Sequence, residues 1–367
     1  MNFIHGSQGK YGIGQPVSRS EDPHLLKGEG IFTDDISLPE QLYAYIIRST
    51  FAHGNILSID KTQAEAMPGV YKIITGKDLI HYNNLHCPMT IKSKDGTPLR
   101  KPARPSLSTD KVRFVGDPIA CVVASTLQEA KDAADAVFVD IEPLPAVTSA
   151  KHAIIPDAPQ LFEDVTQNLA LDFHFGDVEA VNEAFKNAHH ISKATIRNNR
   201  VVVASMEPRS ALAEFDEETE RYTVHMGCQG TFGMRQQLAA LLNVEPEKVR
   251  VLTRNVGGSF GMKSFAYPEY ICLLHAAKTL KRPIKWTDER SSSFLSDQQG
   301  RDHDVEGELA LDKEGHFLAV RLSLFSNLGG YLAAVGPNMA TNNMVKNITS
   351  VYKTPAIEIN TKCVFTN

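Results

Sequence analysis

A glycine-rich loop between a predicted strand and a predicted helix restricts the fold of this 367-residue chain more than any other feature. The loop reads RNVGGSFGMK, from Arg254 to Lys263, and three of its ten residues are glycine. It follows the β-branched run Lys248–Thr253, and a helical pattern covers Pro268–Leu280. Glycines leave backbone N–H groups bare, so such a loop can approach an anionic group closely. The pattern predicts a strand, a ligand-contacting loop and a helix in succession.

Charge and composition exclude several classes of protein. The formal net charge is −5, with 42% hydrophobic and 22% charged residues, and without a long basic block there is no electrostatic basis for nucleic-acid binding. The sequence has neither a signal-peptide run nor a stretch of about 18 apolar residues, so we expect a cytoplasmic protein with no transmembrane segment. Five scattered cysteines form no Cys-x-x-Cys pair. The chain by itself therefore predicts neither a disulfide framework nor an iron–sulfur cluster.

The first 150 residues show a mixed α+β pattern. We expect an N-terminal arm over residues 1–20 and an α/β domain over residues 21–150. The predicted strands of this domain are Leu42–Thr50, Gly69–Gly76 and Asp117–Ser125, and the predicted helices cover 61–68 and 126–137, the second capped by Thr126. This order lacks the regular βαβ alternation of a doubly wound nucleotide fold.

The second region, residues 151–367, is rich in hairpin signals. One predicted hairpin joins strands at 211–216 and 221–226, and another joins 305–311 to 318–325, with Gly315 in its turn. A helix is expected over 231–244, capped by Thr231. Its predicted apolar face consists of Met234, Leu238, Leu241 and Leu242.

Two motifs at a fixed separation carry a resemblance to a known family. MGCQG (Met226–Gly230) ends a predicted strand, and Phe260 of VGGSFGMK follows Gln229 by 31 residues. In this combination the chain resembles the molybdopterin-binding large subunit of the molybdenum hydroxylases, which include xanthine dehydrogenase, aldehyde oxidase and aerobic carbon monoxide dehydrogenase. Further matching segments are RSEDPHLLKGEGIFTDDI (19–36), VRFVGDPIA (112–120) and MEPRSALAEFD (206–216). The resemblance implies a hammerhead-like α/β N-terminal domain, followed by the first part of a mixed α+β molybdopterin-binding domain.

The resemblance also implies roles for the loop residues. The Gln229 amide would donate a hydrogen bond to an oxo ligand of molybdenum without adding charge. Gly257, Gly258 and Gly261 would remove side chains, so that the backbone of Ser259 and Phe260 lies against the cofactor. The Phe260 ring would form one wall of a substrate pocket. We expect Gln229 and Phe260 to lie together beside one cavity, with no direct metal ligand from this chain. The alternative is a tight structural turn with a core phenylalanine.

Three residues depart from patterns within this family. Ser259 stands where glycine is most common, so its φ must suit a residue with a Cβ atom. Ser264 and Asn343 stand where purine-oxidising members carry Glu and Arg. We expect Phe260, Ser264 and Asn343 to line the substrate pocket. Without the two charged groups, the resemblance favours a carbon monoxide dehydrogenase-like or aldehyde oxidoreductase-like activity over a xanthine-specific one.

The family's C-terminal segments do not appear in this sequence, and several expectations follow. The molybdopterin-binding domain should be completed by a separate chain that carries the general-base Glu, so this chain contains no catalytic residue of its own. The cofactor would be molybdenum-molybdopterin in the cytosine dinucleotide form, with iron–sulfur clusters and FAD on other subunits. The final strand, Ala356–Thr366, should have an unpaired edge. Two alternatives remain, a non-catalytic remnant or assembly scaffold of the same fold and, less favoured, a dinucleotide-dependent oxidoreductase.

Overall fold

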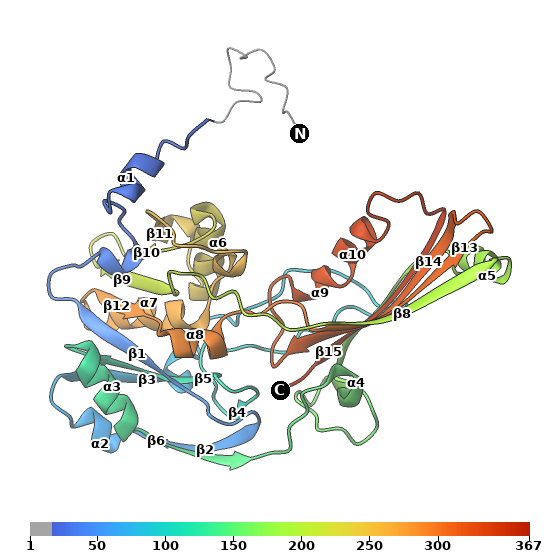
Figure 1. Ribbon diagram of the computed structural model, residues 1–367. Coiled ribbons are helices and arrows are strands. Elements are labelled where there is room, and N and C mark those ends of the chain that lie inside the picture. The colour runs from blue at the N-terminus through green and yellow to red at the C-terminus, as the bar shows by residue number, and fades with distance from the viewer. Residues whose placement is uncertain (1–16) are drawn as a thin grey trace.

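The structure is a computed structural model that describes residues 17–367, so most of the predicted arm over residues 1–20 lies outside the described residues. Figure 1 shows a larger body, built around one broad sheet, beside an extended sheet that holds the C-terminal residues. Within residues 17–367, no helix combines the length and the apolar composition needed to cross a membrane.

A seven-stranded sheet forms the centre of the larger body. In spatial order its strands are β11 (Val249–Leu252), β10 (Arg221–Met226), β9 (Ser210–Asp216), β12 (Ile284–Thr287), β1 (Leu42–Arg48), β5 (Pro118–Ala124) and β3 (Val70–Thr75). Three of these strands precede residue 150 and four follow it. The division of the chain near residue 150 therefore stays a prediction, because one sheet takes strands from both sides of it.

Helices cover the seven-stranded sheet, and a small sheet lies beside it. The small sheet contains β4 (Lys111–Val112), β2 (Gly54–Asp60) and β6 (Phe138–Pro143). Helix α7 (Pro268–Leu280) is buried from Pro268 to Ala277, as its nearly continuous apolar sequence requires. The other helices of this body are α1 (Asp22–Leu26), α2 (Thr62–Glu65), α3 (Leu127–Ala136), α6 (Thr231–Leu242) and α8 (Arg290–Ser296).

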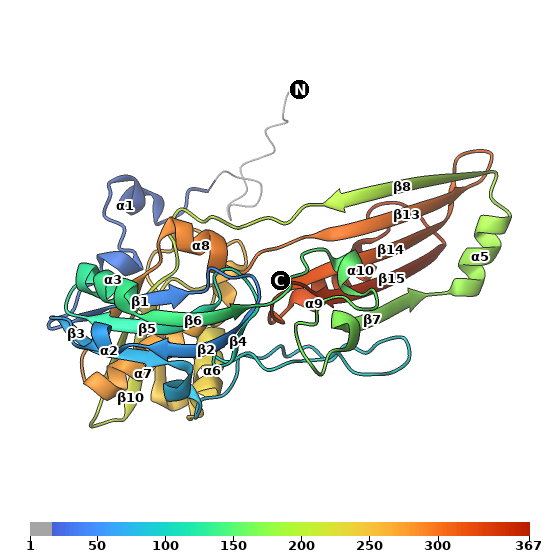
Figure 2. The same ribbon diagram turned by 90° about the horizontal axis from the view of Figure 1, so that it is seen from below.

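A five-stranded sheet forms the second body and extends away from the first (Figure 2). Its spatial order is β7 (Leu169–Gly176), β15 (Ala356–Phe365), β14 (Phe317–Gly329), β13 (His303–Leu311) and β8 (His190–Asn198). The helices that accompany it are α4 (Ala150–Ala153), α5 (Val178–Lys186), α9 (Gly336–Met339) and α10 (Asn342–Asn347). Short 3-10 turns complete the chain at Thr33–Asp35, Gly76–Leu79, Thr166–Asn168, Pro246–Lys248 and Met262–Ser264.

The final strand is not an edge strand, so the expectation of an unpaired C-terminal edge is wrong. β15 pairs in parallel with β14 and antiparallel with β7. Cys363, Val364 and Phe365 are fully buried between these neighbours. Alternating apolar residues identified a strand with a buried face, but that pattern carries no information about which strands lie on either side of it.

Most other predicted elements form where local signals placed them. Both predicted hairpins are present, with Asp216 opposite Arg221 in one and with Gly315 at φ 86° in the turn of the other. The predicted apolar face of α6 is buried. The predicted cap of α6 is wrong, because Gly230 (φ 125°) is the N-cap residue and Thr231 is the first helical residue. Because glycine has no Cβ, Gly230 can adopt this positive φ, which an L-residue rarely adopts.

Helix α3 provides a test of a local signal. The Thr126 side chain accepts a hydrogen bond from the Glu129 N–H, and the Glu129 carboxylate accepts one from the Thr126 N–H. Thr126→Ala should therefore lower the free energy of unfolding by about 1 kcal/mol. Ser149→Ala is the matched control, since Ser149 is the N-cap of α4 and makes no capping bond. Urea denaturation of both variants measures the difference, and equal losses would contradict the capping role.

Candidate functional site

The glycine-rich loop and Gln229 lie side by side because two strands run in parallel. β10 and β11 are neighbours, with Tyr222 opposite Val249 and His225 opposite Leu252. The carboxyl ends of parallel strands meet at the same edge of a sheet, which is where open α/β sheets bind ligands. The chain after β10 leads to Gln229, and the chain after β11 leads into the loop. Gln229 and Phe260, which are far apart in the sequence, therefore lie close together, as predicted.

Three donors hold the side-chain carbonyl of Gln229. Its Oε1 accepts hydrogen bonds from Ser259 Oγ at 2.7 Å, Ser264 Oγ at 2.9 Å and the Gly261 N–H at 3.1 Å. The Gln229 N–H also donates to the Lys263 carbonyl at 3.0 Å. Because the Gly261 N–H can only donate, it orients Oε1 toward the loop, and the exposed Nε2 has no hydrogen-bond partner among residues 17–367. Gln229 therefore presents an uncharged donor outward.

The loop backbone adds further donors around this amide. Gly258 (φ 101°), Phe260 (φ 50°) and Gly261 (φ 92°) are left-handed, whereas Ser259 is not among the positive-φ residues. The backbone therefore accommodates the Cβ of Ser259 without a rearrangement. In the described part of the chain, the N–H groups of Gly258, Ser259 and Phe260 have no acceptor. Such successive free N–H groups form a concave surface that suits anionic oxygen atoms.

A buried ion pair supports the loop from below. Lys263 is 1% exposed, and its Nζ contacts the Glu207 carbonyl at 2.9 Å and the Glu207 carboxylate at 2.8 Å. The same carboxylate accepts the Gly257 N–H at 2.9 Å, so this N–H is not available to a ligand. A Cβ at Gly257 would lie 2.4 Å from the Glu207 Cβ, which explains the glycine by packing. Sequence reasoning gave no role to Glu207 or Lys263, although both lie in matched segments.

The predicted substrate-pocket residues do not all come together. Ser264 belongs to the Gln229 cluster, and the exposed Phe260 ring lies over Gly258. Asn343 lies in α10, over the five-stranded sheet (Figure 1), and its side chain is bonded to Asn347. Within residues 17–367, no hydrogen bond joins Asn343 to the Gln229 cluster, so its place in a substrate pocket stays a prediction.

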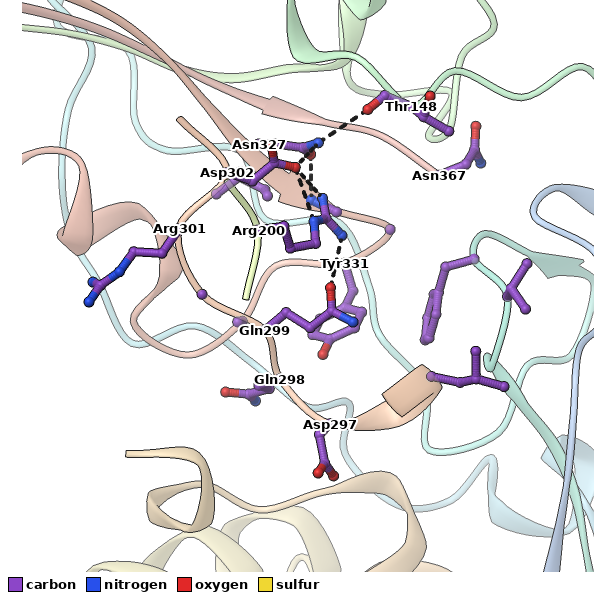
Figure 3. A pocket seen from close by; sticks show the side chains of 18 of the residues that line it. Thr148, Arg200, Asp297, Gln298, Gln299, Arg301, Asp302, Asn327, Tyr331 and Asn367 are labelled. Carbon is purple, nitrogen blue, oxygen red and sulfur yellow. Dashed lines mark hydrogen bonds and ion pairs between the residues drawn. The ribbon is translucent and has the colours of Figure 1, made fainter. Parts of the chain in front are cut away.

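One cavity lies between the two bodies and has a volume of about 300 Å³ (Figure 3). Asp302 organises one wall, accepting hydrogen bonds from Arg200 Nη2 and Asn327 Nδ2, both at 2.8 Å. A second cavity, of about 230 Å³, is lined by Phe265 and Ala266 just beyond the loop. Neither cavity is lined by Gln229 or Phe260, so the expected cavity beside those two residues is not confirmed.

A network of buried charges fixes the elements behind the loop. Arg209 is fully buried and contacts Glu269 at 2.8 Å, Asp297 at 2.5 Å and Asp288 at 3.4 Å. Arg48 also contacts Glu269, at 2.8 Å. Burial by itself would raise the pKa of Glu269, but the two guanidinium groups outweigh it and hold that pKa well below its ordinary value. Burial raises the pKa of Asp288, and the guanidiniums only partly oppose this rise.

Family descriptions match both regions of the chain. The family described as "Molybdopterin cofactor-binding domain" matches residues 161–367, and "Aldehyde oxidase and xanthine dehydrogenase, a/b hammerhead domain" matches residues 27–145. The chain is 32% identical over 360 residues to 6-hydroxypseudooxynicotine dehydrogenase complex subunit gamma of Paenarthrobacter nicotinovorans, covering 97% of this chain and 44% of that relative. Reconstituted CO dehydrogenase from Oligotropha carboxidovorans superimposes with a TM-score of 0.85 at 29% identity, covering 95% of this chain and 44% of that one.

The relatives differ in how much of their length is matched. The chain spans under half of the two relatives above. It spans 79% of the nicotinate dehydrogenase large molybdopterin subunit of Eubacterium barkeri, to which it is 28% identical over 97% of its own length. Chains not much longer than this one therefore occur among its relatives.

The buried network generates a stability prediction. Arg209→Met removes the guanidinium while leaving three carboxylates buried, which should lower the free energy of unfolding by about 3–5 kcal/mol. The control Arg197→Met removes a half-exposed guanidinium that also pairs with two carboxylates, Asp302 and Asp304, and should cost less than about 1 kcal/mol. Chemical denaturation of both variants in the same preparation measures the two losses.

The pH dependence of the same variant has a definite sign. Because the folded-state pKa of Glu269 is depressed, its stabilisation is present above the unfolded value of about 4.3 and is lost as the pH falls. In Arg209→Met the buried carboxylates, of which Glu269 keeps only Arg48 as a partner, take up protons in that range, which reduces the cost of burying their charge. The difference in the free energy of unfolding between parent and variant should therefore become smaller below about pH 4. Equal losses in Arg209→Met and Arg197→Met at neutral pH would contradict the central role of Arg209.

Proposed function

Because the chain belongs to the molybdopterin cofactor-binding domain family, with the hammerhead domain of aldehyde oxidase and xanthine dehydrogenase preceding it, we propose that it is the molybdopterin-binding portion of a molybdenum hydroxylase that catalyses oxidative hydroxylation. The observation that carries the proposal is the exposed Nε2 of Gln229, which has no acceptor among residues 17–367, together with the loop N–H groups that are free in the same residues.

The residues around Gln229 fit an anionic, oxygen-rich cofactor. Gln229 and the N–H groups of Gly258, Ser259 and Phe260 supply neutral donors, which can hold oxygen atoms without a charge to be desolvated. The nearby Glu207 carboxylate is neutralised by Lys263 and turned toward Gly257. The donor surface therefore faces no unpaired carboxylate from this cluster. We infer that Gln229, Ser259, Phe260 and the loop glycines hold the cofactor, with Gly257 acting through the fold of the loop.

When bound, the molybdenum–molybdopterin group would supply the two-electron oxidation of the substrate. The residues of this chain would bind and orient that group. The amide of Gln229 would be held in one orientation by its three donors, and Phe260 would keep water from one side of the site. The general-base Glu is expected in the remaining part of the large subunit, so the site in this chain is incomplete by itself.

The proposed substrate class follows from two positions that lack the charged side chains of purine-oxidising members. Ser264 contributes a hydroxyl to Gln229 and no carboxylate, and Asn343 carries no positive charge. A site without these two charges would not hold a purine by paired polar contacts. We therefore propose an activity of the carbon monoxide dehydrogenase or aldehyde oxidoreductase type over a xanthine-specific one. Relatives named for 6-hydroxypseudooxynicotine and nicotinate add nitrogen heterocycles to the substrates worth testing.

The proposal extends to partners. The rest of the large subunit would be a separate chain, in accord with a relative called a large molybdopterin subunit that this chain spans to 79%. Electrons would leave through iron–sulfur and FAD subunits, since the cysteine spacing here suits no cluster. The cofactor would be the cytosine dinucleotide form, and the location cytoplasmic. The alternative is a remnant or scaffold of the same fold that binds no molybdenum.

A charge change at Gln229 tests the proposal. Gln229→Glu keeps the side-chain shape but replaces the outward NH2 with a carboxylate oxygen, which removes a donor and repels an anionic cofactor. Loss of a hydrogen bond to a charged group costs about 1.5–3 kcal/mol, which corresponds to a fall of roughly 10- to 100-fold in turnover. Turnover is measured on the native complex with carbon monoxide, an aldehyde, nicotinate and xanthine, and molybdenum per chain is measured by elemental analysis.

The matched control is Gln63→Glu, which makes the same charge change at an exposed position in α2. This control should keep parental molybdenum content and turnover. Full molybdenum and full turnover in Gln229→Glu would refute the role of Gln229. A parent complex without molybdenum would favour the scaffold alternative.

A further inference from the structure

The two edges of the five-stranded sheet are treated differently by the chain. At one edge, three of the eight residues of β7 are buried, and the segment 92–100 covers its first half through the bonds Lys94 N–H to Asp172 carbonyl and Arg100 N–H to Ala170 carbonyl, at 2.8 and 3.0 Å. At the other edge, β8 pairs with β13 through all nine of its residues and is exposed at every one of them. Within residues 17–367, no strand lies on the outer side of β8, as Figure 2 shows.

β8 also lacks most of the features that usually protect an edge strand. Natural edges are blunted by proline, bulges, short length or charged side chains, especially lysine. β8 has nine residues, contains no proline, and keeps a regular register with β13. Its two cationic side chains are engaged by β13, with Lys193 bonded to Glu308 at 2.7 Å and Arg197 to Asp304 at 2.8 Å. The strand is therefore long, pairs with β13 without a bulge, and leaves its outer edge open to a further strand.

The face of β8 opposite Lys193 is apolar at its centre, between Ser192 and Asn198. Ala194 and Ile196 lie on it, opposite Gly307 and Val305 of β13. A hollow of about 300 Å³ opens on this face, lined in part by Ala194, Leu309 and Val320. Ile196 is 54% exposed. A strand added at this edge would find backbone partners along β8 and apolar side chains on one face.

The open edge is continuous with the Gln229 face. The chain leaves β8 through Val201, which is half exposed, and reaches Met206, which is 89% exposed, before Glu207 joins the loop at Gly257. Phe232 and Phe260, each 80% exposed, follow Gln229 on α6 and on the loop. These exposed apolar side chains, on the segment that leaves β8 and on the two elements beside Gln229, suit contact with a partner. A partner that covers the Gln229 face would therefore be able to continue along β8.

We propose that β8 is a sheet-extension site, occupied in the assembled enzyme by a strand from the remaining part of the large subunit. The inference rests on the proposed function and identifies a surface that the partner uses. The relatives matched over only 44% of their length carry more than as much sequence again, which is enough to cover both the Gln229 face and the edge. Pairing of this kind supplies main-chain hydrogen bonds along β8 and an apolar contact at Ala194 and Ile196.

Amide hydrogen exchange in the native complex tests this site, with the complex purified from its own cells through a tag on this chain. The part of β7 beside the segment 92–100 serves as the internal reference, because this segment already covers its edge. The amides of β8 should exchange as slowly as those of β7. Exchange at β8 at least about tenfold faster than at β7, in a complex that contains molybdenum, would overturn the inference and leave the proposed function intact. A preparation with neither a second chain nor molybdenum would overturn both.

A pair of variants tests the same site through the partner. Ile196→Lys places a charge on the apolar face, whereas the control Thr195→Lys places one on the opposite face, next to Glu306. Ile196→Lys should reduce the recovered second chain at least about tenfold, and Thr195→Lys should leave it unchanged. Equal recovery in both variants would overturn the inference. Cross-links from Lys193 should lead to the second chain, and cross-links to another copy of this chain would overturn the assigned occupant.

Discussion

The buried guanidinium of Arg209 is the interaction on which the larger body depends. Arg209 precedes β9, and its three carboxylate partners come from α7, the end of β12 and the end of α8. Burial of these carboxylates is offset by Arg209, with a further contribution from Arg48 at Glu269, and burial of the Arg209 guanidinium is offset by the carboxylates. Two residues earlier, Glu207 bonds to Gly257 and Lys263. One short segment therefore joins the charged core to the ligand-facing loop, and the position of the loop follows from the packing of the sheet.

Local signals in the sequence predicted those parts of the fold that depend on near neighbours. Pro268 in the first turn of α7 and Gly315 in the turn between β13 and β14 each set a backbone conformation by their own chemistry. The association of Gln229 with the loop was also predictable, because the family resemblance supplied both motifs. The pairing of β15 was not, since an alternating pattern describes the faces of a strand and not its edges. The sheet that joins β1 to β12 across residue 150 depends on the same non-local pairing.

Charged support within the site left no periodic signal for sequence reasoning to find. Glu207 and Lys263 lie 56 positions apart and are buried as a pair, so neither appears as part of an apolar face or a capping motif. Their burial makes sense only when the loop is folded over them, because Glu207 then satisfies the Gly257 N–H as well as the Lys263 ammonium. The negative charge of Glu207 is thereby paired with Lys263 and does not face the free N–H groups of the loop. The geometry of the loop and its electrostatics are thus set by the same two residues.

The two serines near Gln229 show how departures from a family pattern can depend on one another. An amide can turn by 180°, which would exchange its donor and its acceptor, and only its neighbours decide between the two states. Here the Gly261 N–H can only donate, so it favours the state in which Oε1 faces the loop, and the hydroxyls of Ser259 and Ser264 donate to the same oxygen. Glycine at 259 would remove one of these donors. Glutamate at 264 would replace another with an acceptor that competes with Oε1 for the rest. Ser264, which stands where purine-oxidising members carry Glu, is therefore also one of the residues that bond to Gln229.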